Sequence, residues 1–214
     1  MNQAAGCIQQ QVRGSIHLLP LLMLFLACIG CSDQPRLSPI PQDWTILAFG
    51  DSLTYGTGVP ASQSYPAVLQ TLTGHEVFRS GVPGEVSTAG LERLASVLRE
   101  VRPDLVILCH GGNDILRRMP GSATQSNLHR MVDLVRREGA QVVLIAVPKL
   151  GIFPEAQDYY ETLHDVLQVP VEFDIIAELE SDRSMKSDQI HFNQQGYRLL
   201  AQAVHDLLKQ TGAL

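Results

Sequence analysis

The fold is decided first by the stretch Thr45-Ile46-Leu47-Ala48-Phe49-Gly50-Asp51-Ser52-Leu53-Thr54, in which an apolar run ends in a turn of small and polar residues. Short apolar runs that are rich in β-branched residues and bounded by Gly or Pro are typical of strands buried on both faces of a parallel sheet. Further runs of this kind lie at residues 76–78, 105–109 and 142–147, with a weaker one at 171–176. We therefore expect a parallel sheet of about five strands.

Segments with helical spacing separate these runs. Their apolar stripes are formed by Leu91, Leu94, Leu98 and Val101, by Leu128, Met131, Val132 and Val135, and by Leu199, Leu200, Ala203, Val204, Leu207 and Leu208. Pro103, Gly139 and Gly212 follow the three stripes and mark helix ends, while Asn193 can cap the last helix. Strands that alternate with helices predict an α/β fold with helices on both faces of the sheet.

The length and charge of the chain indicate one globular domain. The 214 residues suit a single domain, which we place at residues 43–214 behind a polar, Pro-containing linker at 32–42. The formal net charge of −6 offers no basic surface to a polyanion, so we expect no nucleic-acid partner. Cys109 is the one cysteine of the domain and lies in an apolar run, so we expect a buried thiol and no disulfide or zinc site.

The N-terminal segment is typical of a secretory signal. Arg13 is its only formally charged residue, and the apolar segment 16–29 that follows is too short for a comfortable transmembrane span. The end of the segment resembles the lipobox of bacterial lipoproteins, with Cys31 as the acylated residue and Cys28 as a competing frame. We expect residues 1–31 to be a signal peptide and Cys31 to carry a lipid anchor. The protein would then be a periplasm-facing lipoprotein of the bacterial cell envelope, or secreted.

Residues that can carry chemistry follow the first three apolar runs. Ser52, Gly84 and Asn113 come after successive runs, and in α/β sheets function gathers in the loops beyond the carboxyl ends of the strands. Each has an ordinary structural alternative. A serine in a Gly-rich turn is usually a turn former, the loop 81–87 can be a tight connection capped by Ser87, and Asn113 can cap a helix.

Asp188 and His191, near the C-terminus, are further candidates and form a pair. Because they are three residues apart, one tight turn can bring both side chains to a shared site. An isolated pair of this kind is more often a surface contact, and it supplies too few ligands for a metal ion. His110, at the end of the third run, is a further candidate to line the site.

Taken together, these segments resemble the four blocks of the SGNH, or GDSL, esterase/lipase superfamily. The blocks are Gly50-Asp51-Ser52-Leu53, Gly81 with Gly84, Gly111-Gly112-Asn113-Asp114, and Asp188 with His191. The resemblance implies a flavodoxin-like, three-layer α/β/α sandwich and no metal or organic cofactor. It also implies that Ser52 is the nucleophile, that His191 is the general base and that Asp188 orients it. The Ser52 and Gly84 amides and the Asn113 side chain would form the oxyanion hole.

The chain is similar in particular to the bacterial thioesterase I/lysophospholipase/arylesterase branch. This similarity covers Gly56, Gly58, residues 90–94 and residues 111–114, whereas Arg79 stands where the second block often begins with Asn. It implies a serine esterase that cleaves carboxylic esters or thioesters of small acyl or lipid substrates through an acyl-enzyme. We expect the protein to be a monomer. Two alternatives stay open: a carbohydrate O-acetyl esterase of the cell envelope, and a non-catalytic lipoprotein that binds a lipid or glycan.

Two loops are expected to form the acyl pocket. They are residues 115–122 and 150–160, in which Ile152, Phe153 and Tyr159 would supply apolar walls.

Overall fold

The computed structural model describes residues 34–149, 151 and 154–214. The predicted signal peptide and the predicted anchor at Cys31 lie outside the described residues, as do Ile152 and Phe153. Within the described ranges, no helix is both long enough and apolar enough to cross a membrane.

The centre of the domain is a parallel five-stranded sheet with the strand order β2-β1-β3-β4-β5. The strands are β1 (Thr45–Gly50), β2 (Glu76–Gly81), β3 (Leu105–Cys109), β4 (Gln141–Ile145) and β5 (Val171–Glu172). In the register, Leu47 of β1 lies between Phe78 of β2 and Val106 of β3. This is the flavodoxin-like strand order, so the predicted fold class is confirmed.

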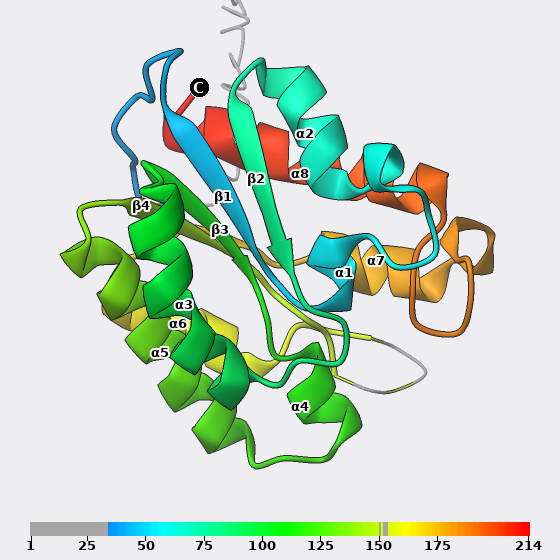
Figure 1. The fold of residues 1–214 in the computed structure, drawn as a ribbon. Helices are drawn as coiled ribbons and strands as arrows, with labels where there is room; N and C mark the ends of the chain where they lie inside the picture. Colours follow the sequence, from blue (N-terminus) through cyan, green and yellow to red (C-terminus); the bar gives the residue numbers. More distant parts are fainter. Residues whose placement is uncertain (1–33, 150, 152–153) are drawn as a thin grey trace, which may run out of the picture. The chain divides into compact units, whose positions relative to one another are not determined.

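Helices cover both faces of the sheet, which gives three layers (Figure 1). The helices α3 (Ser87–Val101), α5 (Gly121–Arg137) and α6 (Asp158–Leu167) pack side by side on one face. The helices α2 (Tyr65–Thr73), α7 (Ile175–Ser181) and α8 (Gln194–Thr211) belong to the other, where α8 contacts both of its neighbours. Two short helices, α1 (Ser52–Tyr55) and α4 (Gly112–Leu116), follow β1 and β3 directly, and 3₁₀ turns span Ala61–Gln63 and Arg183–Met185.

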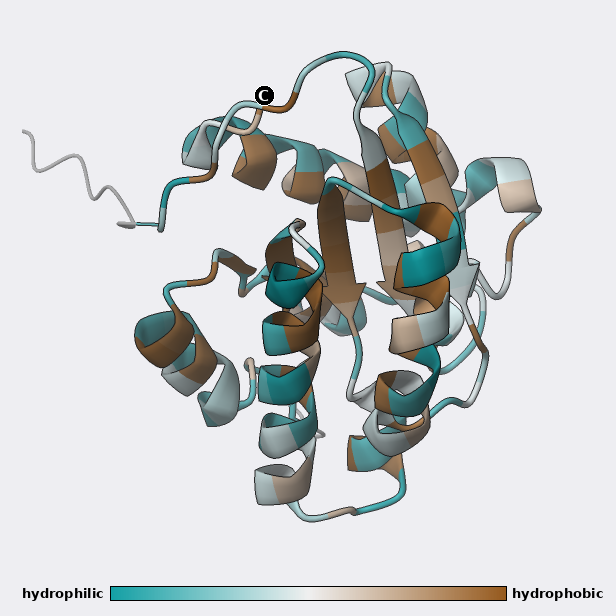
Figure 2. Cartoon of the chain, turned by 60° about the vertical axis from the view of Figure 1, so that its left-hand side comes forward, coloured by the Kyte–Doolittle hydropathy of each residue, from teal (hydrophilic) through white to brown (hydrophobic). Residues whose placement is uncertain are grey.

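The core is formed by the strands and by the helix faces turned toward them. Every residue of β3 is buried, including the predicted buried thiol of Cys109, and β1 is buried from Ile46 onward. Figure 2 shows the central strands in brown, whereas the helices carry teal residues on their outer sides. The predicted helix stripes are confirmed except at Leu199, which is 37% exposed on α8.

The run at residues 171–176 is not a full strand, contrary to our expectation. Only Val171 and Glu172 pair with β4, and α7 begins at Ile175. The Glu172 carboxylate accepts hydrogen bonds from the amides of Asp174 and Ile175, at 3.1 and 2.9 Å, and so satisfies the first turn of α7. A short apolar run cannot be assigned to strand or helix by its periodicity alone.

The described part of the predicted linker contacts the domain. The Leu37 and Ile40 amides donate to carbonyl groups at the end of α8, those of Thr211 and Ala213. The Ile40 side chain is buried. Residues 34–42 therefore belong to the packed structure.

Candidate active site

Ser52 lies at the carboxyl end of β1, the strand between β2 and β3, and is the first residue of α1. Asp51 is the N-cap of this short helix, because its Oδ1 atom accepts a hydrogen bond of 3.1 Å from the Leu53 amide. The Ser52 amide belongs to the first turn, where N–H groups have no partner within the helix. The hydroxyl and the amide of Ser52 thus both stand at the end of the sheet.

His191 contacts Ser52 directly. Its Nε2 atom lies 3.0 Å from Ser52 Oγ, and its Nδ1 atom lies 2.8 Å from Asp188 Oδ2. A carboxylate can only accept, so the ring hydrogen is assigned to Nδ1, which leaves Nε2 free to accept the serine proton. Hydrogen bonds from the His191 amide and ring to Asp188, together with one from the Ile190 amide, lower the pKa of Asp188 to about 2. The structure therefore brings the predicted Ser, His and Asp into one chain of hydrogen bonds.

The loop that carries Asp188 and His191 is fixed at both ends. Asn193 caps α8, as predicted, since its Oδ1 atom accepts from the Gln195 and Gly196 amides at 3.0 and 3.1 Å. Its Nδ2 atom donates to the Ser184 carbonyl at 2.7 Å, which ties the start of the loop to its end. These contacts place His191 beside a serine that is 139 positions away in the sequence.

The two expected oxyanion elements lie in the loop after β2 and in the short helix α4 after β3. Gly84 has a φ of +79°, which favours glycine, and its amide donates to no acceptor among the described residues. Asn113 lies within α4, whose N-cap is Gly111, so the capping alternative for Asn113 is wrong. Its Nδ2 atom donates to Asp51 Oδ2 at 3.1 Å, and its second N–H is left for another acceptor.

Ser87 does not cap α3, contrary to the structural alternative for this loop. The N-cap is Val86, and Ser87 is the first residue of the helix. The Ser87 amide and hydroxyl both donate to the buried carboxylate of Asp114, at 2.8 and 2.5 Å. These bonds join the loop after β2 to α4.

Asp51 is a site residue whose role the sequence patterns did not reveal. It is buried and binds Asn113 as well as capping α1. Burial raises the pKa of the Asp51 carboxyl, against the lowering effect of His110 and of the Leu53 and Asn113 hydrogen bonds. The available signal was an Asp between a strand end and a helix start, which is typical of an N-cap.

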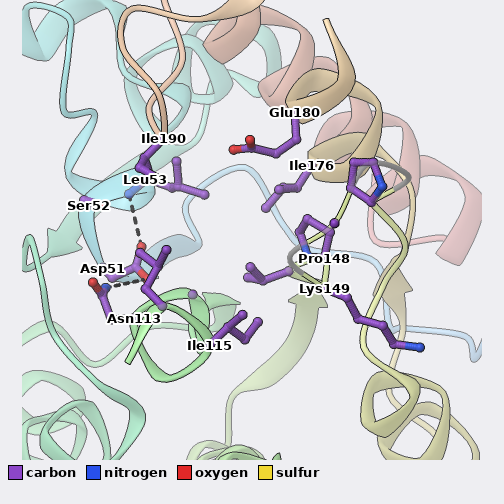
Figure 3. Close-up of a pocket in the computed structure, with 15 residues that line it drawn as sticks. Asp51, Ser52, Leu53, Asn113, Ile115, Pro148, Lys149, Ile176, Glu180 and Ile190 are labelled. Atoms are coloured by element: carbon purple, nitrogen blue, oxygen red, sulfur yellow. Dashed lines mark hydrogen bonds between the residues drawn. The ribbon is translucent and has the colours of Figure 1, made fainter. Parts of the chain in front are cut away.

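A cavity of about 140 Å³ opens beside Ser52 (Figure 3). Ser52, Asp51 and Asn113 lie on one side of it, while Ile115, Pro148 and Ile176 form apolar walls. Glu180 of α7 also lines the cavity and is paired with Lys186. The volume of this cavity is close to that of protein cavities that hold a benzene ring.

The loop predictions for this cavity are confirmed in part. Ile115 and Leu116 line it, as do Gly151 and Pro154. Tyr159 does not: it packs beside Gly111 and Gly121, within 4 Å of where their Cβ atoms would stand. Tyr159 belongs to the first turn of α6, and the centroid of its ring lies 4.8 Å from that of Tyr160.

Two further predicted residues are placed as follows. Arg79 donates to the Tyr55 carbonyl at 2.6 Å and lies over the Tyr55 ring, so it ties β2 to the end of α1. His110 does not line the cavity: it is fully buried and contacts Glu85. Among the described residues, no group of three or more His, Cys, Asp or Glu side chains is arranged to hold a metal ion.

Residues 48–199 match the GDSL-like lipase/acylhydrolase family. The sequence is 35% identical over 130 residues to Esterase TesA of Pseudomonas aeruginosa. This alignment covers 58% of this chain and 65% of the relative. It is 33% identical over 137 residues to an arylesterase of Vibrio mimicus, covering 62% of this chain and 64% of that protein. The matches thus span less than two thirds of the length of these curated relatives.

The solved structures that resemble the domain have the same fold. The crystal structure of TesA superposes with a TM-score of 0.72 at 28% identity, over 78% of this chain and 99% of that chain. The SGNH-hydrolase family esterase AlinE4 gives a TM-score of 0.61 at 26% identity, over 80% of this chain and 97% of that chain.

Proposed function

Because the chain belongs to the GDSL-like lipase/acylhydrolase family, we propose that it is a carboxylic ester hydrolase with Ser52 as its nucleophile. The observation that carries this proposal is the line of contacts from Ser52 Oγ through His191 to Asp188, at 3.0 and 2.8 Å. A serine hydroxyl is a weak nucleophile unless a neighbouring base accepts its proton, and this geometry supplies the base.

In the first half of the proposed reaction, Ser52 Oγ adds to the ester carbonyl carbon while His191 Nε2 takes the hydroxyl proton. The carbonyl oxygen becomes an oxyanion, which the Ser52 and Gly84 amides and the second Asn113 N–H stabilise. The bond to the alcohol then breaks, and His191 gives its proton to the leaving oxygen. Asp188 stabilises the imidazolium that exists between these two proton transfers.

In the second half, water releases the acyl group from Ser52. His191 Nε2 accepts a proton from the water as its oxygen adds to the acyl carbon. Collapse of the second tetrahedral intermediate breaks the bond to Ser52 Oγ, which regains its proton from His191. The products are the free acid and the original enzyme.

The test of this proposal is covalent labelling by a fluorophosphonate combined with ester hydrolysis. We expect Ser52 Oγ to displace fluoride and become labelled, and we expect Ser52→Ala to lose about 10⁴-fold to 10⁶-fold in turnover. Asn113→Ala should lose about 10²-fold to 10³-fold, because it removes one oxyanion donor. Near-wild-type hydrolysis by folded Ser52→Ala protein would contradict the assignment.

The substrates that the cavity favours are esters with an aryl or short acyl group. A cavity of about 140 Å³ with apolar walls accommodates a group of about the size of a benzene ring. The arylesterase name of the Vibrio mimicus relative is in line with this proposal. The proposal includes thioesters as substrates, because the same oxyanion hole stabilises the oxyanion formed from an ester or from a thioester.

The carbohydrate O-acetyl esterase stays as the enzymatic alternative, and the lipid- or glycan-binding lipoprotein as the non-catalytic one. Rates of hydrolysis of acetylated sugars and of phenyl acetate separate the two esterases. Both substrates carry an acetyl group, so only the alcohol part differs. A folded protein that binds lipid but takes no fluorophosphonate label would favour the binding protein.

We further propose that the protein is a monomer held in the bacterial cell envelope by a lipid on Cys31. The lipobox-like sequence supports the anchor. Labelled palmitate should enter the full-length protein and be lost in Cys31→Ala but not in Cys28→Ala. Loss of the label in Cys28→Ala but not in Cys31→Ala would show that Cys28 carries the lipid.

A further inference from the structure

One buried hydrogen bond joins the loop after β2 to the loop after β3, and the reaction described above does not use it. His110 Nε2 lies 3.2 Å from Glu85 Oε2, and the two side chains are 0% and 7% exposed. Glu85 directly follows Gly84, and His110 directly precedes the Gly111-Gly112-Asn113 segment. The contact therefore links the loop that carries Gly84 to the connection directly before Asn113 and its helix α4.

Arg93 already balances the charge of Glu85. Its Nε and Nη2 atoms donate to the two carboxylate oxygens at 2.8 and 2.7 Å, and its Nη1 atom donates to Ser80 Oγ at 2.6 Å. Burial favours the neutral form of Glu85, but the hydrogen bonds from Arg93 and His110 outweigh it and lower the pKa of Glu85 to about 2. Because the ion pair with Arg93 is complete, the contact with His110 is not needed as a counter-charge.

His110 extends the connection to the backbone of the next loop. Its Nδ1 atom accepts a hydrogen bond of 3.1 Å from the Gly111 amide, so the ring hydrogen is assigned to Nε2, which donates to Glu85. Gly90 of α3 makes room for the ring, since a Cβ atom there would stand 2.3 Å from Nε2. Both ring nitrogens are thus used, and the ring has one orientation.

We propose that Glu85 and His110 are positioning residues that keep the Gly84 amide and the Asn113 side chain directed at the same oxygen atom. The inference rests on the proposed function, because it concerns the oxyanion hole of that reaction. The two donors come from separate segments, and such a constellation must be held to about 0.5 Å. Glu85 is adjacent to the first donor and His110 is three residues from the second, so their hydrogen bond helps to set the separation of the two. It acts beside the Ser87 bonds to Asp114 and the bond of 2.8 Å from Arg117 Nη2 to the Gly84 carbonyl.

The first test is steady-state hydrolysis of nitrophenyl acetate by the full-length His110→Leu, His110→Gln and Glu85→Gln proteins. We expect kcat to fall about 10-fold to 100-fold in His110→Leu, as small displacements of catalytic groups do, with KM nearly unchanged. His110→Gln, whose side-chain N–H can still reach Glu85, should recover part of kcat. His75→Leu is the control, because it removes another buried histidine, at the opposite end of β2, and should leave kcat unchanged.

A double-mutant cycle with Asn113→Ala separates positioning from general stability. If His110 acts through the oxyanion donors, His110→Leu should cost clearly less kcat in the Asn113→Ala background than in the wild type. An equal loss in both backgrounds overturns the proposal. The proposal is also overturned if the Glu85 and His110 variants have lower melting temperatures but the wild-type kcat. Should His110→Leu not fold, the Gln variants at positions 110 and 85 enter the same cycle.

Ser52→Ala distinguishes a failure of this inference from a failure of the proposed function. If Ser52→Ala is as active as the wild type, the proposed reaction is wrong. If Ser52→Ala is inactive while the folded Glu85 and His110 variants keep the wild-type kcat, only the positioning role is wrong.

Discussion

The carboxylate of Asp51 does two tasks with its two oxygen atoms. Oδ1 caps the helix that begins at the proposed nucleophile Ser52, and Oδ2 holds the Asn113 amide. A single buried side chain therefore sets the positions of the nucleophile and of one oxyanion donor relative to each other. This dual contact explains why an acidic residue stands next to Ser52 in a buried environment.

We expect Asp51→Asn to lower kcat by about 10²-fold, close to the cost of losing one oxyanion donor. An Asn side chain can still accept from the Leu53 amide, but its own NH₂ group would then face the NH₂ group of Asn113. Steady-state ester hydrolysis measures the effect. Asp104→Asn is the matched control, because Asp104 also accepts a backbone N–H, that of Thr45, at the opposite end of β1. Equal kcat values for both variants would contradict the role of Asp51.

Glu85 should contribute to stability in a pH-dependent way. Its pKa is lowered from 4.5 to about 2 in the folded protein, so the unfolded chain binds more protons between these pH values. The stability that Glu85 contributes is therefore present above about pH 4.5 and is lost as the pH falls toward 2. Urea unfolding should show that Glu85→Gln destabilises the protein at pH 6 and much less at pH 3. The exposed Glu92→Gln on α3, the helix that follows the Glu85 loop, is the control, and an equal effect of Glu85→Gln at both pH values would contradict the prediction.

At the scale of the elements, helix starts and strand ends place the site. The first turns of α1 and α4 follow β1 and β3 after only one and two residues, and so carry Ser52 and Asn113 to the edge of the sheet. The N-terminus of α8 does the same for the loop of Asp188 and His191, through the Asn193 cap. The loop after β2 is attached to these elements by the bonds of Ser87 to Asp114.

Asn193→Ala should destabilise the protein by about 1 kcal/mol, which is the usual cost of losing an N-cap. It should also lower kcat, because the bond from Asn193 to the Ser184 carbonyl is lost with it. Asn193→Ser separates the two effects, since a serine hydroxyl can accept from the helix amides but does not replace that bond. Thermal unfolding and ester hydrolysis measure them. If Asn193→Ser fails to regain stability over Asn193→Ala, the capping role is wrong.

At the scale of the whole molecule, the position of the site follows from the strand order. The chain passes from β1 to β2 on one side and then to β3 on the other, so the connections diverge at the carboxyl end of β1. In open α/β sheets a crevice forms at this point of reversal, and ligands bind there. Ser52 lies at this point, and the cavity opens beside it.

The size of the cavity predicts selectivity for acyl chain length. Each additional CH₂ buried contributes about 0.8 kcal/mol, or about fourfold in kcat/KM, until the cavity is filled. A series of nitrophenyl esters should therefore rise from acetate to about hexanoate and then level off, as a cavity of benzene size implies. Ile115→Trp, which fills the cavity, should remove the rise but keep acetate hydrolysis. Val166→Trp on the exposed surface of α6 is the control. A continued rise to dodecanoate would contradict the prediction.

The sequence by itself determined the sheet, most of its helices and the candidate residues. Buried parallel strands and amphipathic helices leave periodic patterns that depend on local spacing alone, as in the stripe of α8 and the Asn193 cap. The run at 171–176 forms a strand only at Val171 and Glu172, because its few apolar residues fit a strand and a helix equally well. The Glu172 bonds to the α7 amides decide between them only once the chain is folded.

Only the tertiary structure decided which polar residues meet. The Ser52 to His191 contact, the Asp51 to Asn113 bond and the Glu85 to His110 bond each join separate loops, 139, 62 and 25 positions apart. No local pattern encodes such distances, because they depend on the strand order and on how the helices pack. For the same reason, His110 was expected to line the cavity but is fully buried, where α3 leaves space at Gly90.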